Sequence, residues 1–99
     1  MSDRGDVVRK HLRITILRIL LESPGYTANN SMITDLTQNY GQRPSRDNVR
    51  IELSWLKAQG LVNTDGESKL IIASLTERGA DVARGREVIP GVKRPSAGS

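Results

Sequence analysis

The sequence contains no cysteine, no phenylalanine and a single histidine among its 99 residues. Without cysteine the chain forms no disulfide and offers no thiolate to a metal, a composition that fits a cytoplasmic protein. No apolar run approaches the roughly 20 residues that a membrane helix needs, and the N-terminal MSDRGD has no apolar signal core. We therefore expect a cytoplasmic protein without a membrane partner.

Groups suited to catalysis are equally scarce. His11 lies in the basic segment 9–13 with no second metal ligand nearby in sequence, so a surface histidine is the simpler reading than a metal ligand or a general base. No glycine-rich loop follows a strand in the way that a phosphate cradle requires. The carboxylates alternate with bases, which is typical of weak surface pairs. We predict no catalytic residue, no metal site and no cofactor, and hence a protein that is not an enzyme.

The size and charge indicate one small domain with a polyanionic partner. Fifteen basic and 11 acidic residues give a net charge of +4, which fits nucleic acid. With 36% hydrophobic residues and three aromatics, the core must be aliphatic and modestly stable, so we expect a homodimer. We divide the chain into a flexible N-terminus, 1–6, one folded domain, 7–86, and a flexible basic tail, 87–99.

The stretch 44–62 predicts one helix running into one strand. Ser45 is a good N-cap, Asp47 places negative charge in the first turn, and Gly60 can end the helix in the left-handed conformation. The apolar residues that recur at i, i+4 and i+7 form one buried stripe: Val49, Leu53 and Leu56. The polar arc off this stripe carries three positive charges and comprises Arg46, Asp47, Arg50, Ser54 and Lys57.

Two further helices precede this stretch. Residues 7–23 predict a helix whose main apolar face comprises Val8, Leu12, Ile16, Ile19 and Leu20. Other apolar residues extend round its axis, so it either meets a second subunit or is covered by the rest of the monomer. A very short strand at 26–27 is followed by a helix capped by Asn29 or Asn30, with Ile33, Leu36 and Tyr40 directed inward and Gly41 at its end. With the helix 45–59 this forms a helix-turn-helix.

A hairpin and a last helix follow. Residues 61–63 and 70–76 predict antiparallel strands, and Asp65-Gly66 at the tip is a strong hairpin signal. Leu75 is the predicted core residue of the second strand. Residues 77–86 predict a short helix with Ala80 and Ala83 on its packing side.

Three motifs carry a resemblance to a known family. S-R-x-x-V-x-x-x-L-x-x-L-x-x-x-G-L-V, beginning at Ser45, resembles the recognition helix and following strand of winged-helix transcription regulators of the ArsR, MarR and PadR kinds. Leu75 to Gly79, LTERG, resembles the L-T-x-x-G that closes their wing, and PGVKRPS near the C-terminus is similar to small winged-helix proteins of Mu-like bacteriophages. The resemblance covers roughly residues 8–84. It does not bring the metal sensor of ArsR proteins, whose cysteines are absent.

The resemblance implies an α+β, mainly α fold, the winged helix-turn-helix, with a three-helix core, a β-hairpin wing and a C-terminal helix. It also implies sequence-specific binding of double-stranded DNA by a transcription regulator. In this reading the helix 45–59 enters the major groove and the wing 63–69 lies on the backbone.

The chemistry of the groove assigns roles to the predicted site residues. Arg46 and Arg50, one turn apart, can each make a bidentate contact to guanine. Asp47 would repel phosphate unless it pairs with an arginine or accepts from cytosine. The other predicted DNA-binding residues are Arg43 and Ser45 for phosphate at the helix N-terminus, Asn48 for adenine or for the cap, Ser54 and Lys57 on the arc, and Lys69 for phosphate from the wing.

Ile51 and Trp55 fit this scheme least well, because on a helical wheel they lie away from the apolar stripe. One interpretation is that the last helix, the tail or the N-terminus covers them. Alternatively they form a protein interface, the basis of a rival function as an interaction or phage accessory module, or Ile51 meets a thymine methyl group. The tail bases Lys93 and Arg94 are read either as a solubilising end or as a phosphate-contacting arm.

Overall fold

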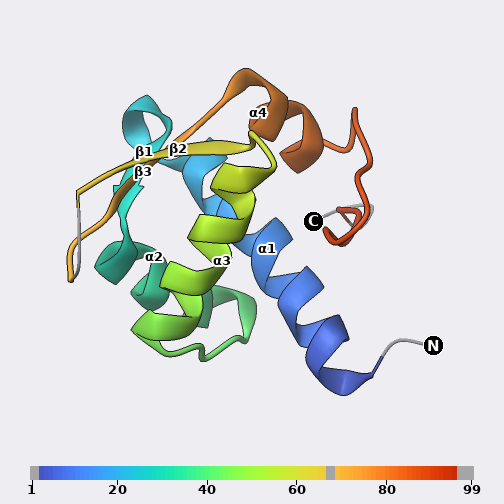
Figure 1. Cartoon of the computed structure of the whole chain (residues 1–99), viewed down its shortest axis with the longest axis horizontal. Helices are drawn as coiled ribbons and strands as arrows, with labels where there is room; N and C mark the ends of the chain where they lie inside the picture. Colours follow the sequence, from blue (N-terminus) through green and yellow to red (C-terminus); the bar gives the residue numbers. More distant parts are fainter. Residues whose placement is uncertain (1–2, 67–68, 96–99) are drawn as a thin grey trace.

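A computed structural model of the chain describes residues 3–66 and 69–95 (Figure 1). The four α-helices of this part are α1 (Arg4–Glu22), α2 (Asn30–Leu36), α3 (Arg46–Ala58) and α4 (Glu77–Ala83). Three short strands, β1 (Thr27–Asn29), β2 (Val62–Asp65) and β3 (Ile72–Leu75), and two 3₁₀ turns, Pro24–Tyr26 and Thr37–Tyr40, complete it. None of the described helices combines the length and the apolarity that a membrane crossing requires.

The first helix begins at Arg4, three residues before the predicted start. The Asp3 carboxylate accepts a hydrogen bond from the backbone N of Asp6 at 2.7 Å and caps the helix, so residues 3–6 do not fray as predicted. Residues 1 and 2 lie outside the described chain. From Leu12 to Leu20 almost every side chain of α1 is buried by the rest of the monomer. Of the predicted apolar face only Val8 is exposed, on the end of α1 that extends beyond the body (Figure 1).

The helix-turn-helix forms as predicted, with one correction. Asn29 caps α2 through a hydrogen bond from the backbone N of Met32 at 2.8 Å, and Ile33 is fully buried. The last turn tightens into the 3₁₀ turn Thr37–Tyr40, and Gly41 ends it. Tyr40, predicted to point inward, is exposed because three residues per 3₁₀ turn rotate it away from the direction that an α-helix gives.

The third helix has the predicted cap and the predicted stripe. Val49, Leu53 and Leu56 are completely buried. Gly60 has a φ of 77°, which supports the predicted left-handed end. These local signals seat α3 against α1 and α2 with one long side facing solvent (Figure 1).

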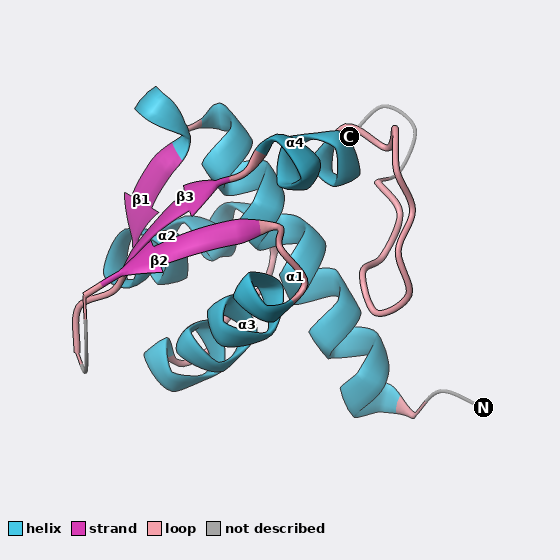
Figure 2. Ribbon diagram, turned by 45° about the horizontal axis from the view of Figure 1, so that its top comes forward, coloured by secondary structure: helices cyan, strands magenta, loops and turns pink. Residues whose placement is uncertain are grey.

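The strands form one antiparallel sheet in the order β1-β3-β2 (Figure 2). The second wing strand is shorter than the predicted 70–76, whereas the first runs to Asp65 instead of ending at residue 63. Ala73 rather than Leu75 is the fully buried residue of β3. Leu75 is partly buried and packs against the core. Part of the predicted wing tip, residues 67 and 68, lies outside the described chain. The last helix ends at Ala83 rather than at residue 86, with Ala80 and Ala83 buried as predicted.

The segment after α4 is not the flexible tail that we predict, at least up to residue 95. Ile89 and Val92 are buried, and the backbone N of Lys93 donates to the carbonyl of Lys10 at 3.3 Å. These two apolar side chains pack into the core cluster to which α1 contributes. The predicted tail residues 96–99 lie outside the described chain.

Candidate nucleic-acid interface

The solvent-facing side of α3 carries two parallel lines of residues. With 3.6 residues per turn, Arg46, Arg50 and Lys57 fall on one edge, which we call the cationic row. The side opposite the buried stripe carries the outer line, which consists of Asp47, Ile51, Ser54 and Ala58. All members of both lines are exposed except Arg50, which is half-buried. The polar arc predicted from the sequence therefore comprises the cationic row and two of the four outer-line residues, Asp47 and Ser54.

The cationic row faces the wing. Arg46, Asp47 and Arg50 line a shallow hollow together with Lys69, in the loop between the wing strands, and Asn30, at the start of α2. We call this the wing-side hollow. The structure thus brings together three predicted site residues, Arg46, Arg50 and Lys69, from elements far apart in the sequence. Five others do not line the hollow but are exposed at the surface: Arg43, Ser45, Asn48, Ser54 and Lys57.

Asp47 pairs with an arginine. This is one of the two arrangements that we expect to prevent its carboxylate from repelling phosphate. Arg50 donates from Nη2 to Asp47 Oδ1 at 2.9 Å, with side chains 43% and 76% exposed. An ion pair this exposed contributes little and exchanges easily with other partners. The pair keeps the guanidinium of Arg50 at the surface, beside Arg46, instead of inside the subunit.

The N-terminus of α3 is held by a reciprocal cap. The backbone N of Asn48 donates to Ser45 Oγ at 3.0 Å, and the backbone N of Ser45 donates to Asn48 Oδ1 at 3.2 Å. Asn48 therefore serves the cap, one of the two roles predicted for it. The hydroxyl hydrogen of Ser45 can still donate to an acceptor such as phosphate.

Asn30 is a positioning residue that our reading of the sequence does not identify beyond a possible cap. Its side chain is 2% exposed, and it donates to the carbonyl of Lys69 at 3.2 Å and accepts from the backbone N of Ile71 at 3.0 Å. These bonds join the start of α2 to the residues just before β3. They fix Lys69 relative to the helix-turn-helix and so shape the wing-side hollow.

Asn30→Ala is expected to lower the free energy of unfolding by about 1–3 kcal/mol, because it removes two hydrogen bonds from partly buried backbone groups. Urea denaturation measures this loss, and the amide of Ile71 should exchange its hydrogen faster. Asn63→Ala, at an exposed position of β2, is the matched control, with an expected change within about 0.5 kcal/mol. Equal stability of the two variants would contradict the anchoring role.

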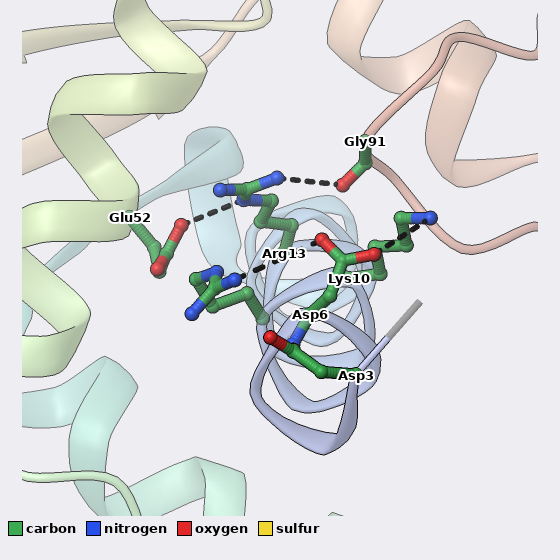
Figure 3. Close-up of polar contacts among 7 residues, drawn as sticks. Asp3, Asp6, Lys10, Arg13, Glu52 and Gly91 are labelled. Atoms are coloured by element: carbon green, nitrogen blue, oxygen red, sulfur yellow. Dashed lines mark hydrogen bonds and ion pairs between the residues drawn. The ribbon is translucent and has the colours of Figure 1, made fainter. Parts of the chain in front are cut away.

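A buried ion pair fixes α3 against α1 (Figure 3). Arg13 Nε donates to Glu52 Oε1 at 2.6 Å, with side chains 11% and 5% exposed. Arg13 Nη1 donates to the carbonyl of Gly91 at 2.9 Å, and the guanidinium lies 3.8 Å from the centroid of the Trp55 ring. One arginine of α1 thus holds both α3 and the C-terminal segment.

The sequence contains a signal for this pair that our reading missed. Glu52 falls on the same side of α3 as the apolar stripe, and a carboxylate on a buried face needs a cationic partner. We treated the carboxylates as weak surface partners, which is wrong for Glu52, and we assigned Arg13 no role beyond its place in the basic segment around His11.

Ile51 and Trp55 have different surroundings. Trp55 is half-buried beneath Arg13 and Gly91, which confirms for this residue the interpretation that the tail covers it. Ile51 is 60% exposed, so the same interpretation is wrong for Ile51.

The tail bases lie elsewhere. Lys93 and Arg94 line a hollow with His11 and Arg18, which project from the side of α1 roughly opposite Arg13. Because Arg13 faces α3, the predicted role of the tail as a phosphate-contacting arm gains no support from this placement.

Comparison with known proteins places this architecture in a family. No protein-family model matches the sequence. It is 40% identical over 91 residues to a protein of Escherichia phage Mu, "Uncharacterized protein gp26", and the match covers 92% of this chain and 94% of gp26. The chain belongs to the family of phage Mu gp26. A second member of this group, an uncharacterized protein of Haemophilus influenzae, is 40% identical over 74 residues, which are 74% of this chain and 72% of that protein. The resemblance to proteins of Mu-like phages is therefore confirmed.

Solved structures confirm the winged-helix fold of this gp26 relative. Three structures of RosR, a winged-helix regulator of H. salinarum, match it, two of them as the complexes RosR-S1 and RosR-S4. For RosR-S1 the TM-score is 0.61 at 23% identity, over 73% of this chain and 63% of that one. For RosR-S4 it is 0.62 at 25% identity, over 82% and 70%. For RosR itself it is 0.62 at 23% identity, and the chain spans 66% of RosR.

Proposed function

We propose that the protein binds double-stranded DNA sequence-specifically and acts as a transcription regulator. The observation that carries this proposal is the cationic row, which lies at the surface along a capped helix and is continued by Lys69 in the loop between the wing strands. Thirteen residues make α3 about 20 Å long, and a major groove about 12 Å wide admits a helix. The winged-helix fold supports the same conclusion, although a fold by itself does not fix a function.

In the proposed complex, the outward side of α3 enters the major groove. Arg46 and Arg50 reach guanine or flanking phosphates from the row, and Lys57 and Lys69 contact the backbone. Arg43 and Ser45 lie at the N-terminus of α3, where backbone N–H groups favour phosphate. Two copies related by a two-fold axis would present their helices about 34 Å apart, one turn of DNA.

Selection of bound duplexes from a random pool tests the proposal, followed by fluorescence anisotropy on the site obtained. Arg46→Ala and Arg50→Ala are each expected to weaken binding to the selected site by about 1–3 kcal/mol. The affinity for unrelated DNA should fall far less, and circular dichroism should be unchanged because both residues lie at the surface. Retention of full site preference by both variants would rule out this use of α3.

A rival function is favoured by one observation, the exposed Ile51 in the middle of the same helix face. In that reading α3 docks on another protein, and the module serves phage assembly or regulation without DNA contact. Salt separates the two functions. DNA affinity should fall steeply between about 50 and 200 mM salt through counterion release, whereas binding through an apolar contact should change little.

A further inference from the structure

Ile51 occupies the most outward position on the face proposed to enter the groove. It lies opposite the buried stripe of Val49, Leu53 and Leu56, and it is 60% exposed. Asp47 and Ser54, one turn away on either side, share its outer line. Folding of the monomer therefore leaves Ile51, a branched apolar side chain, exposed at the centre of a polar face.

The C-terminal segment packs against the next turn of α3 but leaves Ile51 exposed. The C-terminal segment crosses α3 at Trp55, where Arg13 and Gly91 cover the ring. Trp55 lies on the α1 side of α3, whereas Ile51 lies between that side and the cationic row. The same segment that buries one apolar residue leaves its neighbour one turn away directed to solvent.

We infer that Ile51 is a specificity-determining residue that recognises the C5-methyl group of a pyrimidine in the major groove. The inference rests on the proposed DNA binding. The floor of the major groove presents hydrogen-bond donors and acceptors and one apolar group, the thymine methyl. A residue without polar atoms at the centre of the reading face has only that group to match, whether it belongs to thymine or to 5-methylcytosine.

The charges beside Ile51 favour a nucleic acid over a protein as the occupant of this face. Arg46, Arg50 and Lys57 run along the whole edge of α3 next to Ile51, and Lys69 adds a fourth base nearby. A partner that covers Ile51 closely also approaches this row. A phosphate backbone neutralises such a row on both sides of the groove, while the bases between the two strands meet the outer line.

Replacement of thymine by uracil removes only the methyl group and gives a direct test. In the selected site, each thymine is replaced in turn by uracil, and affinities are measured by anisotropy for the wild type, Ile51→Ser and Ala58→Ser. The wild type should lose about three- to tenfold in affinity at one thymine position. Ile51→Ser should bind the thymine site with a similar loss and no longer distinguish thymine from uracil. Ala58→Ser, two turns along the outer line at an exposed position outside the predicted DNA-binding residues, should distinguish them as the wild type does.

A second experiment with cytosine distinguishes the two possible sources of the methyl group, thymine and 5-methylcytosine. Where the selected site holds cytosine opposite Ile51, 5-methylcytosine should strengthen wild-type binding and leave Ile51→Ser unaffected. If the wild type binds a selected site equally well with and without each methyl group, the role of Ile51 is overturned but the proposed DNA binding is not. A protein that selects no site overturns this role together with the proposed function.

Discussion

Arg13→Leu is expected to lower the free energy of unfolding by about 3–5 kcal/mol, as measured by urea denaturation. The variant leaves the Glu52 carboxylate, 5% exposed, without its cation, and an uncompensated buried charge costs about that much. It also removes the hydrogen bond to the Gly91 carbonyl and the contact with the Trp55 ring. For a domain whose whole stability is about 5–15 kcal/mol, this is enough to populate the unfolded state.

The double variant Arg13→Leu/Glu52→Leu separates lost charge pairing from lost packing. Replacing both members of a buried ion pair by apolar groups is often neutral or stabilising, so the double variant should recover most of the loss. A double variant as unstable as Arg13→Leu alone would show that the ion pair does not account for the effect. Glu52→Leu alone, which leaves the arginine with its other two contacts, should fall between them.

Gly79→Ala is expected to destabilise the protein by about 3 kcal/mol or more, because the added Cβ collides with backbone. A methyl group at Gly79 would overlap the carbonyl oxygen of Leu61 and come within 2.8 Å of Leu75 Cδ1. The Leu61 oxygen also accepts a hydrogen bond from the backbone N of Thr76 at 3.1 Å, so it cannot move away without breaking that bond. Thermal unfolding followed by circular dichroism measures the effect.

The matched control makes the same chemical change where there is room. Gly5 lies in the first turn of α1, and an added Cβ there meets only the flexible side-chain ends of Arg9 and Asp3. Gly5→Ala should be neutral or stabilise the protein by up to about 1 kcal/mol, since alanine favours helix. If the Gly79 variant melts at the same temperature as the Gly5 variant, α4 does not pack closely against the Leu61 carbonyl just before β2.

Features encoded by neighbouring residues could be predicted from the sequence. The cap at Ser45 and the buried stripe of α3 each depend on a few adjacent positions, and their side-chain chemistry fixes them locally. The elements therefore appear in the predicted order, and the fold follows. Their ends shift by a few residues, because the last turn of a helix or strand depends on tertiary contacts.

Features that join distant residues escaped prediction. Arg13 and Glu52 are 39 positions apart, Asn30 and Ile71 are 41 apart, and Arg13 and Gly91 are 78 apart. No local pattern links such partners. The same reason explains the tail, whose Pro and Gly residues indicate irregular chain correctly but do not reveal that Ile89 and Val92 pack into the core.

The candidate interface was predicted in its parts and not in its arrangement. Sequence spacing places Arg46 and Arg50 on an outward side of α3, and both are at the surface. Spacing does not show that Asp47 holds Arg50 or that Lys69, in the loop between the wing strands, lines the same hollow. It also leaves open whether Ile51 is covered, and the structure shows that it is exposed.

Methylation interference on the selected site tests the central claim, that α3 reads the major groove. Dimethyl sulfate modifies N7 of guanine in the major groove and N3 of adenine in the minor groove. We expect N7 methylation at defined guanines to abolish binding by the wild type, and Arg46→Ala or Arg50→Ala to remove the interference at one of them. Interference at adenines alone, or at no base, would contradict the account.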